Sequence, residues 1–229
     1  MLERITPDTE LVSFDLWLTL IKSNGRNFKN IRNAHMGSLL APHMLESDFD
    51  EVVRAQDKMA DKIAESRGQD VLFGERVRLV AKAVGAAEPS ESMLEELYEY
   101  QGKLFQKNLP LLLDDSTPKL LDQIKDSGRE LAIISNTGYM HGDQMRLALD
   151  AIGIGQKFEY KIFSNEVGYA KPDSRIFQRL LDMSGVEASH ITHIGDNARA
   201  DVLGATQIGM QAIHMVGDVS LRSIIEGSV

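Results

Sequence analysis

Cysteine is absent from this chain of 229 residues, which excludes disulfides and thiolate metal sites. Basic residues form no cluster and the formal net charge is −9, which argues against a surface that binds the phosphate backbone of nucleic acids. No apolar run approaches the roughly 20 residues that span a bilayer. The first ten residues, MLERITPDTE, lack the basic and apolar regions of a signal peptide. These absences predict a cytoplasmic protein with neither nucleic-acid nor membrane partners.

Apolar runs typical of short strands are instead spread along the chain. They cover residues 11–14, 131–135, 160–164, 191–195 and 211–216. Helical patterns at 140–152, 174–184 and 198–208 separate the last four runs, and another helical pattern covers 117–126. Strands that alternate with helices predict an α/β fold, with a Rossmann-like parallel sheet and helices on both of its faces.

A long helical segment interrupts this alternation after the first strand. Its apolar periodicity predicts helices over 28–40, 49–65, 73–84 and 93–106. We expect a helical cap domain at residues 22–110, inserted into a core of residues 1–21 and 111–229, with hinges near 22–27 and 108–115. Caps of this kind close over a site and exclude water, so they govern substrate choice. A purely structural helical appendage is the alternative.

Polar motifs follow four of the predicted strands. Asp15 ends the first strand, Ser135-Asn136-Thr137 ends the second, Lys171-Pro172 precedes the helix at 174–184, and Gly195-Asp196 ends a later strand with Asp201 five places on. Each motif alone is typical of turns and helix caps. Together they predict one site, because ligands of open α/β sheets bind beyond the carboxyl ends of the strands.

This ordered set resembles the four motifs of the haloacid dehalogenase superfamily, hydrolases that include members with a helical C1-type cap, and the resemblance covers nearly the whole chain. It implies that Asp15 is a nucleophile that forms an aspartyl ester. It also implies that Thr19, Ser135 and Asn136 contact the phosphoryl group of a small phosphorylated metabolite, and that Lys171 neutralises charge during the transfer.

The acidic residues of the motifs predict a divalent cation. Asp15, Asp196 and Asp201 would repel one another at close range, and Lys171 alone cannot balance them. Mg²⁺ prefers such oxygen ligands and bridges to phosphate. We expect Asp15, Asp196 and the backbone carbonyl of Trp17 to bind Mg²⁺, with Asp201 hydrogen-bonded to metal-bound water or to Lys171.

Trp17 stands where the family motif carries a second Asp, the general acid and base. An indole N–H is only a hydrogen-bond donor and has no proton to give at neutral pH. A phosphatase with Trp17 would therefore need a substrate whose leaving group is already acidic, or a replacement group. His141 and His35 are the candidates for that replacement, although surface or helix-end roles suit both better.

Two further functions stay open at this point. The 2-haloacid dehalogenases carry an aromatic residue at the position of Trp17, but they lack the counterpart of Asp196, and their carboxylate-binding cap arginine has no counterpart between Pro42 and Asp50. A regulatory protein that binds metal or phosphate without turnover is the other possibility, yet Asp15 and Lys171 are intact. A Mg²⁺-dependent phosphatase is the favoured prediction, and the oligomeric state is left open.

Overall fold

A parallel sheet forms the centre of the fold, as the computed structural model of residues 4–25 and 27–227 shows. The predicted core also included residues 1–3 and 228–229, and the predicted first hinge included Arg26, all of which lie outside the described residues. Within those residues the strand order is β5-β4-β1-β6-β7. The strands are β1 (Leu11–Phe14), β4 (Glu130–Ser135), β5 (Tyr160–Phe163), β6 (Ile191–Gly195) and β7 (Gln211–His214). This confirms the predicted α/β class.

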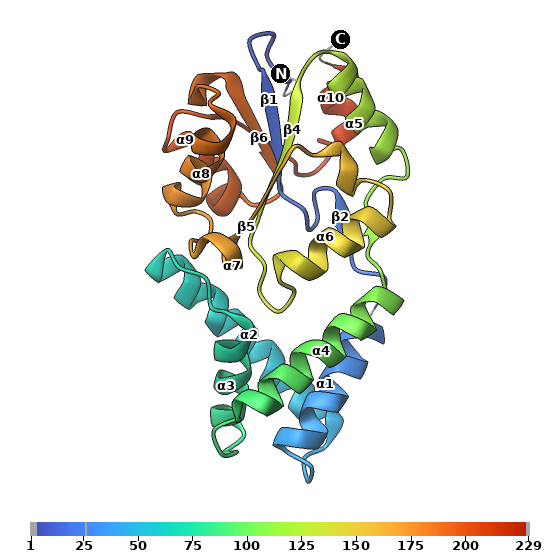
Figure 1. Cartoon of the computed structure of the whole chain (residues 1–229), viewed down its shortest axis with the longest axis vertical. Coiled ribbons are helices and arrows are strands. Elements are labelled where there is room, and N and C mark those ends of the chain that lie inside the picture. The colour runs from blue at the N-terminus through green and yellow to red at the C-terminus, as the bar shows by residue number, and fades with distance from the viewer. Residues whose placement is uncertain (1–3, 26, 228–229) are drawn as a thin grey trace.

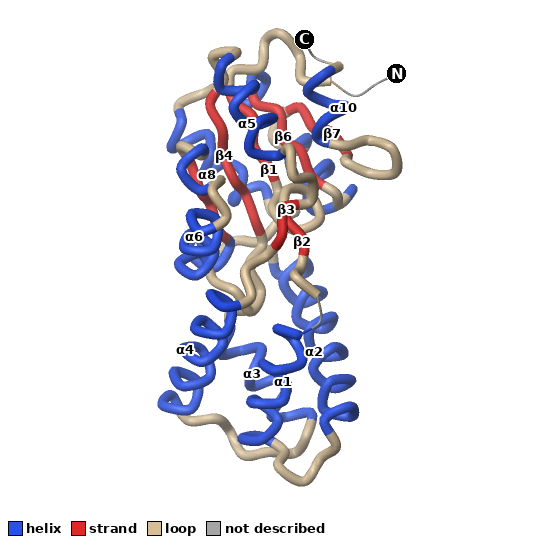
Figure 2. The backbone as a smooth tube through the Cα atoms, turned by 90° about the vertical axis from the view of Figure 1, so that its right-hand side faces the viewer, coloured by secondary structure: helices blue, strands red, loops and turns tan. Residues whose placement is uncertain are grey.

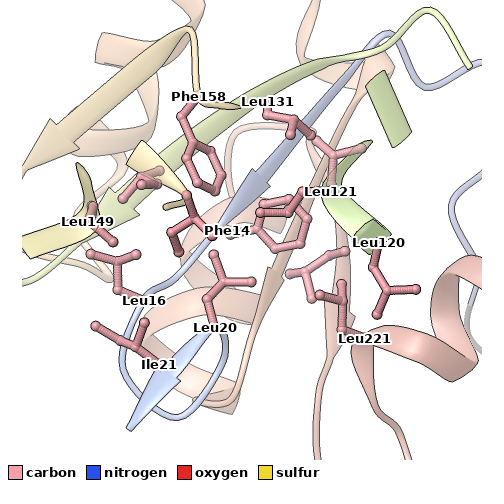
Figure 3. Packing of buried hydrophobic residues seen from close by; sticks show 14 of the residues in the cluster. Phe14, Leu16, Leu20, Ile21, Leu120, Leu121, Leu131, Leu149, Phe158 and Leu221 are labelled. Atoms are coloured by element: carbon pink, nitrogen blue, oxygen red, sulfur yellow. The ribbon is translucent and has the colours of Figure 1, made fainter. Parts of the chain in front are cut away.

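Helices cover both faces of the sheet, so that its inner strands β1 and β6 are buried throughout. Helices α5 (Thr117–Asp126), α6 (Gly142–Ala151) and α10 (Leu221–Glu226) pack on the face that carries Phe14. Figure 3 shows Phe14 among Leu121, Leu131 and Phe158 in this layer. Helices α8 (Ser174–Ser184) and α9 (Gly204–Thr206) pack on the opposite face, which carries Leu11. Successive side chains of β1 thus alternate between two apolar layers.

Helices that follow β1 form a second body beyond the carboxyl ends of the strands (Figures 1 and 2). They are α1 (Asn27–Leu40), α2 (Glu46–Arg67), α3 (Phe73–Ala83) and α4 (Glu91–Lys107). Met36, Phe49, Val77 and Leu97 lie in an apolar cluster between them, separate from the two layers of the sheet. Helix α2 ends at Gly68, whose φ of 65° favours glycine.

Short elements absent from the sequence prediction complete the fold. Strands β2 (Ile21–Lys22) and β3 (Leu111–Leu112) pair antiparallel where the chain leaves the sheet for α1 and returns from α4. Helix α7 (Ser164–Val167) follows β5, and 3₁₀ turns occupy Gly155–Lys157 and Ala188–His190. The predicted helix at 198–208 is divided into a wide π-helical segment, Ala198–Leu203, and the short α9. No helix among the described residues is long and apolar enough to cross a membrane.

Candidate functional site

Strands β1 and β6 are neighbours in the sheet, and the chain leaves them toward opposite sides, so a crevice opens beyond their carboxyl ends. Asp15 follows β1, and Asp196 follows β6. Lys171 reaches the crevice from the loop between α7 and α8, and Asp201 from the π-helical turn after β6. The structure therefore brings these predicted residues together from segments far apart in the sequence.

A buried ion cluster lies at the centre of the crevice. Lys171 Nζ donates hydrogen bonds to Asp15 Oδ1 at 2.7 Å, to Asp201 Oδ1 at 2.6 Å and to the Ile134 carbonyl at 2.8 Å. Only 2% of Lys171, 8% of Asp15 and 1% of Asp201 is exposed. Such charge-assisted bonds in a dry environment fix the positions of both carboxylates.

The Asn136 side chain fixes the main chain of Lys171. Its Nδ2 donates to the Lys171 carbonyl at 3.0 Å, and its Oδ1 accepts from the Lys171 N–H at 2.8 Å. The pair engages only the side-chain amide, so the predicted contact of Asn136 with a phosphoryl group stays a prediction. The Asn136 side chain is therefore a positioning group for the lysine.

His193 supports Asp201 from within the sheet. Its Nδ1 lies 2.8 Å from Ser13 Oγ, and its Nε2 lies 3.3 Å from Asp201 Oδ1. The other Asp201 oxygen accepts from the Asn197 N–H at 2.9 Å. Asp201 also packs closely on β6, since a Cβ at Gly195 would lie 2.3 Å from its carboxyl carbon. Glycine is thus required immediately before Asp196.

Burial and neighbouring charges shift the pKa values of this cluster. Burial, reinforced by Asp201, raises the pKa of Asp15 in spite of Lys171, and burial with Asp201 raises that of Asp196. Burial opposes ionisation of Lys171 and Asp201, but opposite charges prevail: Asp15 and Asp201 raise the pKa of Lys171, and Lys171 lowers that of Asp201. Burial also lowers the pKa of His193, which favours its neutral form. The centre thus holds three carboxyl groups against the single ammonium group of Lys171.

The excess of carboxyl groups over ammonium groups fits a divalent cation. Asp15, Asp196 and Asp201 can each offer one carboxylate oxygen, and these oxygens lie within 4.8 Å of one another. Asp196 is only partly buried, so an ion could reach the cluster from the crevice. Hard carboxylate oxygens are the ligands that Mg²⁺ prefers. The acidic residues that the sequence singled out thus form a cluster that could hold a metal ion.

The cluster opens into a cavity of about 570 Å³ between the sheet and helices α1 to α4. Trp17 and Leu18 line the cavity next to Asp15. Trp17 also packs against the apolar layer around Phe14. Leu18 is 60% exposed and has a φ of 62°, an unfavourable conformation for leucine that the loop after β1 imposes.

Other predicted residues lie outside the lining. Ser135 is buried and donates to the Asn136 carbonyl at 3.3 Å, and the buried Thr19 hydroxyl has no hydrogen-bond partner within the described segments. His141 accepts from the Phe73 N–H at 3.3 Å, and His35 stacks on Tyr100. None of these side chains is among the cavity-lining residues of the described chain, so neither histidine is placed to replace a missing acid.

The structure adds cavity residues that the sequence reasoning missed. They are Tyr139, which follows β4, and two arginines of the helices beyond the sheet, Arg32 of α1 and Arg76 of α3. The two arginines are only 6% and 4% exposed. A cap arginine was expected only between Pro42 and Asp50, and buried arginines in amphipathic helices resemble surface residues in sequence.

Comparison with known proteins identifies the same fold and sequence pattern. The family model described as haloacid dehalogenase-like hydrolase matches residues 9–209. A human haloacid dehalogenase-like hydrolase domain-containing protein 3 is 27% identical over 96% of this chain and 86% of its own length. A phosphoserine phosphatase from Thermus thermophilus is 29% identical over 62% of this chain and 53% of its own. A crystal structure of a phosphatase from Thermococcus onnurineus has a TM-score of 0.66 at 20% identity, covering 92% of this chain and 87% of that one.

Proposed function

The chain belongs to the haloacid dehalogenase-like hydrolases, and on that premise we propose that it is a Mg²⁺-dependent phosphatase of small phosphorylated metabolites. One observation carries the proposal: Asp15 touches the Lys171 ammonium group and also shares a cation-sized cluster with Asp196 and Asp201. A phosphate dianion would be repelled by these carboxylates alone. The name of the Thermus relative supports the same reaction class.

Asp15 would attack the phosphorus of a phosphate ester. A bond forms between a carboxylate oxygen and phosphorus while the bond to the leaving oxygen breaks, which gives an aspartyl-phosphate and the oxyanion of the leaving group, and this oxyanion takes any proton it needs from water. Water then attacks that intermediate, releases inorganic phosphate and restores the carboxylate. Lys171 would hold the Asp15 carboxylate in place and offset negative charge during both displacements.

Asp15, Asp196 and the Trp17 carbonyl would hold Mg²⁺, with Asp201 beside them. When bound, the ion would screen the phosphate from the carboxylates and stabilise charge on the transferring group. His193 and the Asn197 N–H would keep Asp201 oriented toward Lys171. Asn136 would do the same for the Lys171 backbone. The chain thus holds its ionised groups in place before substrate binds.

Trp17 leaves the leaving group without a nearby proton donor. General acid catalysis contributes about 10²- to 10⁴-fold, and mostly when the leaving group is a strong base. We therefore expect acyl and aryl phosphates to be hydrolysed faster than alkyl phosphates. His141 and His35 lie outside the cavity lining and would not change this order.

A substrate panel tests the proposal. Acetyl phosphate, 4-nitrophenyl phosphate, alkyl phosphates and 2-chloropropionate would each be assayed with Mg²⁺ and with a chelator. The proposal expects phosphate release that needs the metal and is fastest for the acyl and aryl esters. Hydrolysis of 2-chloropropionate alone, or phosphate release indifferent to chelator, would contradict it. Metal binding without any turnover would favour a regulatory role.

A further inference from the structure

Among the buried cations that line the cavity, Arg32 has the fewest partners for its charge. Its Nε and Nη2 both donate to Asn33 Oδ1, at 3.0 and 2.8 Å. The Asn33 amide is turned this way because its Nδ2 donates to Asp50 Oδ1 at 2.7 Å. Among the described residues, Nη1 donates no hydrogen bond and no carboxylate lies within 4.0 Å of the guanidinium group. The edge of the guanidinium group formed by Nη1 and the second hydrogen of Nη2 therefore has no hydrogen-bond acceptor among the described residues.

Arg76 provides the contrast. Its Nη1 donates to Asp57 at 2.7 Å, its Nη2 to Asp61 at 2.9 Å and its Nε to the Val71 carbonyl at 2.9 Å. Arg76 thus holds α3 against α2, and each of its nitrogens has a partner. Arg32 lies at similar depth without such partners, so the two buried arginines have different roles.

The surroundings of Arg32 disfavour an isolated charge. Its guanidinium carbon lies 4.2 Å from the centre of the Tyr139 ring, a cation–π contact that compensates only part of the desolvation. Burial lowers the pKa of Arg32, and Tyr139, Asp57 and Asp50 offset this only in part. The Tyr139 hydroxyl is buried without a hydrogen-bond partner in the described chain, and burial raises its pKa to about 12. Among the described residues, the Tyr139 hydroxyl and the Nη1 edge of Arg32 thus both lack an acceptor, and both residues line the cavity.

We propose that Arg32, with Tyr139 beside it, binds a carboxylate of the substrate at the end remote from the transferred phosphoryl group. The inference rests on the proposed phosphatase function and narrows its substrates to phosphate esters of hydroxy acids. The free edge of the guanidinium group matches the two oxygens of a planar carboxylate. A second phosphate fits less well, because Asp57, Asp61 and Asp70 also line the cavity and would repel a dianion.

Matched substrates measure this preference directly. Phosphate esters of 2-, 3- and 4-carbon hydroxy acids would be compared with the corresponding amides, which have the same size and no charge. A charge-assisted hydrogen bond is worth roughly a 10- to 100-fold ratio of kcat/KM between acid and amide at the best chain length. Bisphosphates of the same length test whether a second phosphate, rather than a carboxylate, binds at Arg32.

Variants of Arg32 and Tyr139 show whether these residues cause the acid-to-amide ratio of kcat/KM. Arg32→Gln is expected to bring the acid-to-amide ratio close to one, Arg32→Lys to reduce it, and Tyr139→Phe to lower it with the aromatic ring retained. Arg54→Gln is the matched control, because Arg54 is an exposed arginine of α2 outside the cavity lining and its replacement should leave the ratio as it is. Melting temperatures identify folded variants, and Arg32→Lys and Tyr139→Phe carry the test if Arg32→Gln does not fold.

Failure of the subsite and failure of the phosphatase proposal give different results. An acid-to-amide ratio near one in the wild type, an unchanged ratio in Arg32→Gln, or a preference for bisphosphates would overturn the carboxylate subsite while phosphatase activity stands. If no ester is hydrolysed, calorimetry with phosphonoacetate, 3-phosphonopropionate and their carboxamides tests the subsite by binding. Tighter binding of the acids that Arg32→Gln abolishes would then support the subsite without the phosphatase, and equal binding of acids and amides would refute it.

Discussion

Replacement of Lys171 by methionine gives the sharpest test of the buried ion cluster. Methionine has nearly the same length but no charge, so Lys171→Met removes the donor to Asp15, Asp201 and the Ile134 carbonyl with little change in volume. Both carboxylates would remain buried next to Asp196 without their counter-ion. The change therefore isolates the electrostatic contribution of the ammonium group.

The expected loss follows from the burial of the cluster. Removing one partner of a buried ion pair costs about 3–5 kcal/mol, because the remaining charge stays desolvated. For chains of this size, 1 kcal/mol lowers the melting temperature by roughly 2–4 °C, so a fall of about 6–20 °C is expected for Lys171→Met at pH 8 in chelator. Lys103→Met serves as control, because the Lys103–Glu99 pair is exposed and worth less than about 1 kcal/mol.

The pH dependence of the loss has a definite sign. The pKa of Asp15 is already raised by burial, and loss of Lys171 would raise it further. A carboxyl group with a raised pKa in the folded state stabilises the fold when protonated, and this contribution is lost as the pH rises through that pKa. The deficit of Lys171→Met should therefore shrink on acidification from pH 8 to pH 5.

Urea unfolding of both variants and the wild type, at both pH values and with Mg²⁺ or chelator, measures these effects. Mg²⁺ should also reduce the deficit, since it supplies positive charge to the same carboxylates. A loss below about 1 kcal/mol, equal to that of Lys103→Met, would refute the reasoning. So would a large loss that neither acid nor Mg²⁺ reduces, because it would indicate a packing effect.

Three further predictions concern neighbouring residues. Asp15→Asn should lower kcat by about 10⁴-fold or more, and an active variant would mean that the nucleophile lies elsewhere. The same variant should raise the melting temperature in chelator at pH 8, because it removes a carboxylate whose pKa burial has raised. Trp17→Asp should increase kcat for alkyl phosphates by about 10²- to 10⁴-fold and much less for aryl phosphates, and an equal increase for both would exclude proton transfer as the cause. Mg²⁺ at 100 times its Kd should stabilise the wild type by about 2.7 kcal/mol in thermal scans, and Asp196→Asn should lose most of this gain if Asp196 is a ligand.

The sequence predicted the central sheet well because its signals are local. The run at residues 11–14 is apolar apart from Ser13, as suits a strand buried on both faces, and β1 has these bounds. The predicted bounds of α5 and α8 also agree with the structure. β2 and β3 were missed because strands of two residues carry no periodicity. Helix α10 was missed because one and a half turns give too short an apolar pattern.

The positioning contacts of the site lie beyond the reach of local patterns. Ser13 and His193 are 180 positions apart in the chain, and Asn136 is 35 positions from Lys171. In the sequence, His193 is only a polar residue within an apolar run. Its partners emerge only when β1 and β6 become neighbours. Motif order therefore predicted which residues meet, but not the hydrogen bonds that hold them in place.

The cavity-facing residues of the helices were hidden for a different physical reason. Asp57, Asp61 and Glu65 recur at four-residue spacing on α2, which is the pattern of a solvated helix face, yet all three line the cavity. A face that binds a polar substrate must itself be polar, so periodicity cannot distinguish it from a face in contact with water. Burial does not identify Asp61 and Glu65 either, since both are exposed, but it does identify Arg32. A charged side chain held away from solvent, with no ion-pair partner among the described residues, is expected to take its counter-ion from a ligand.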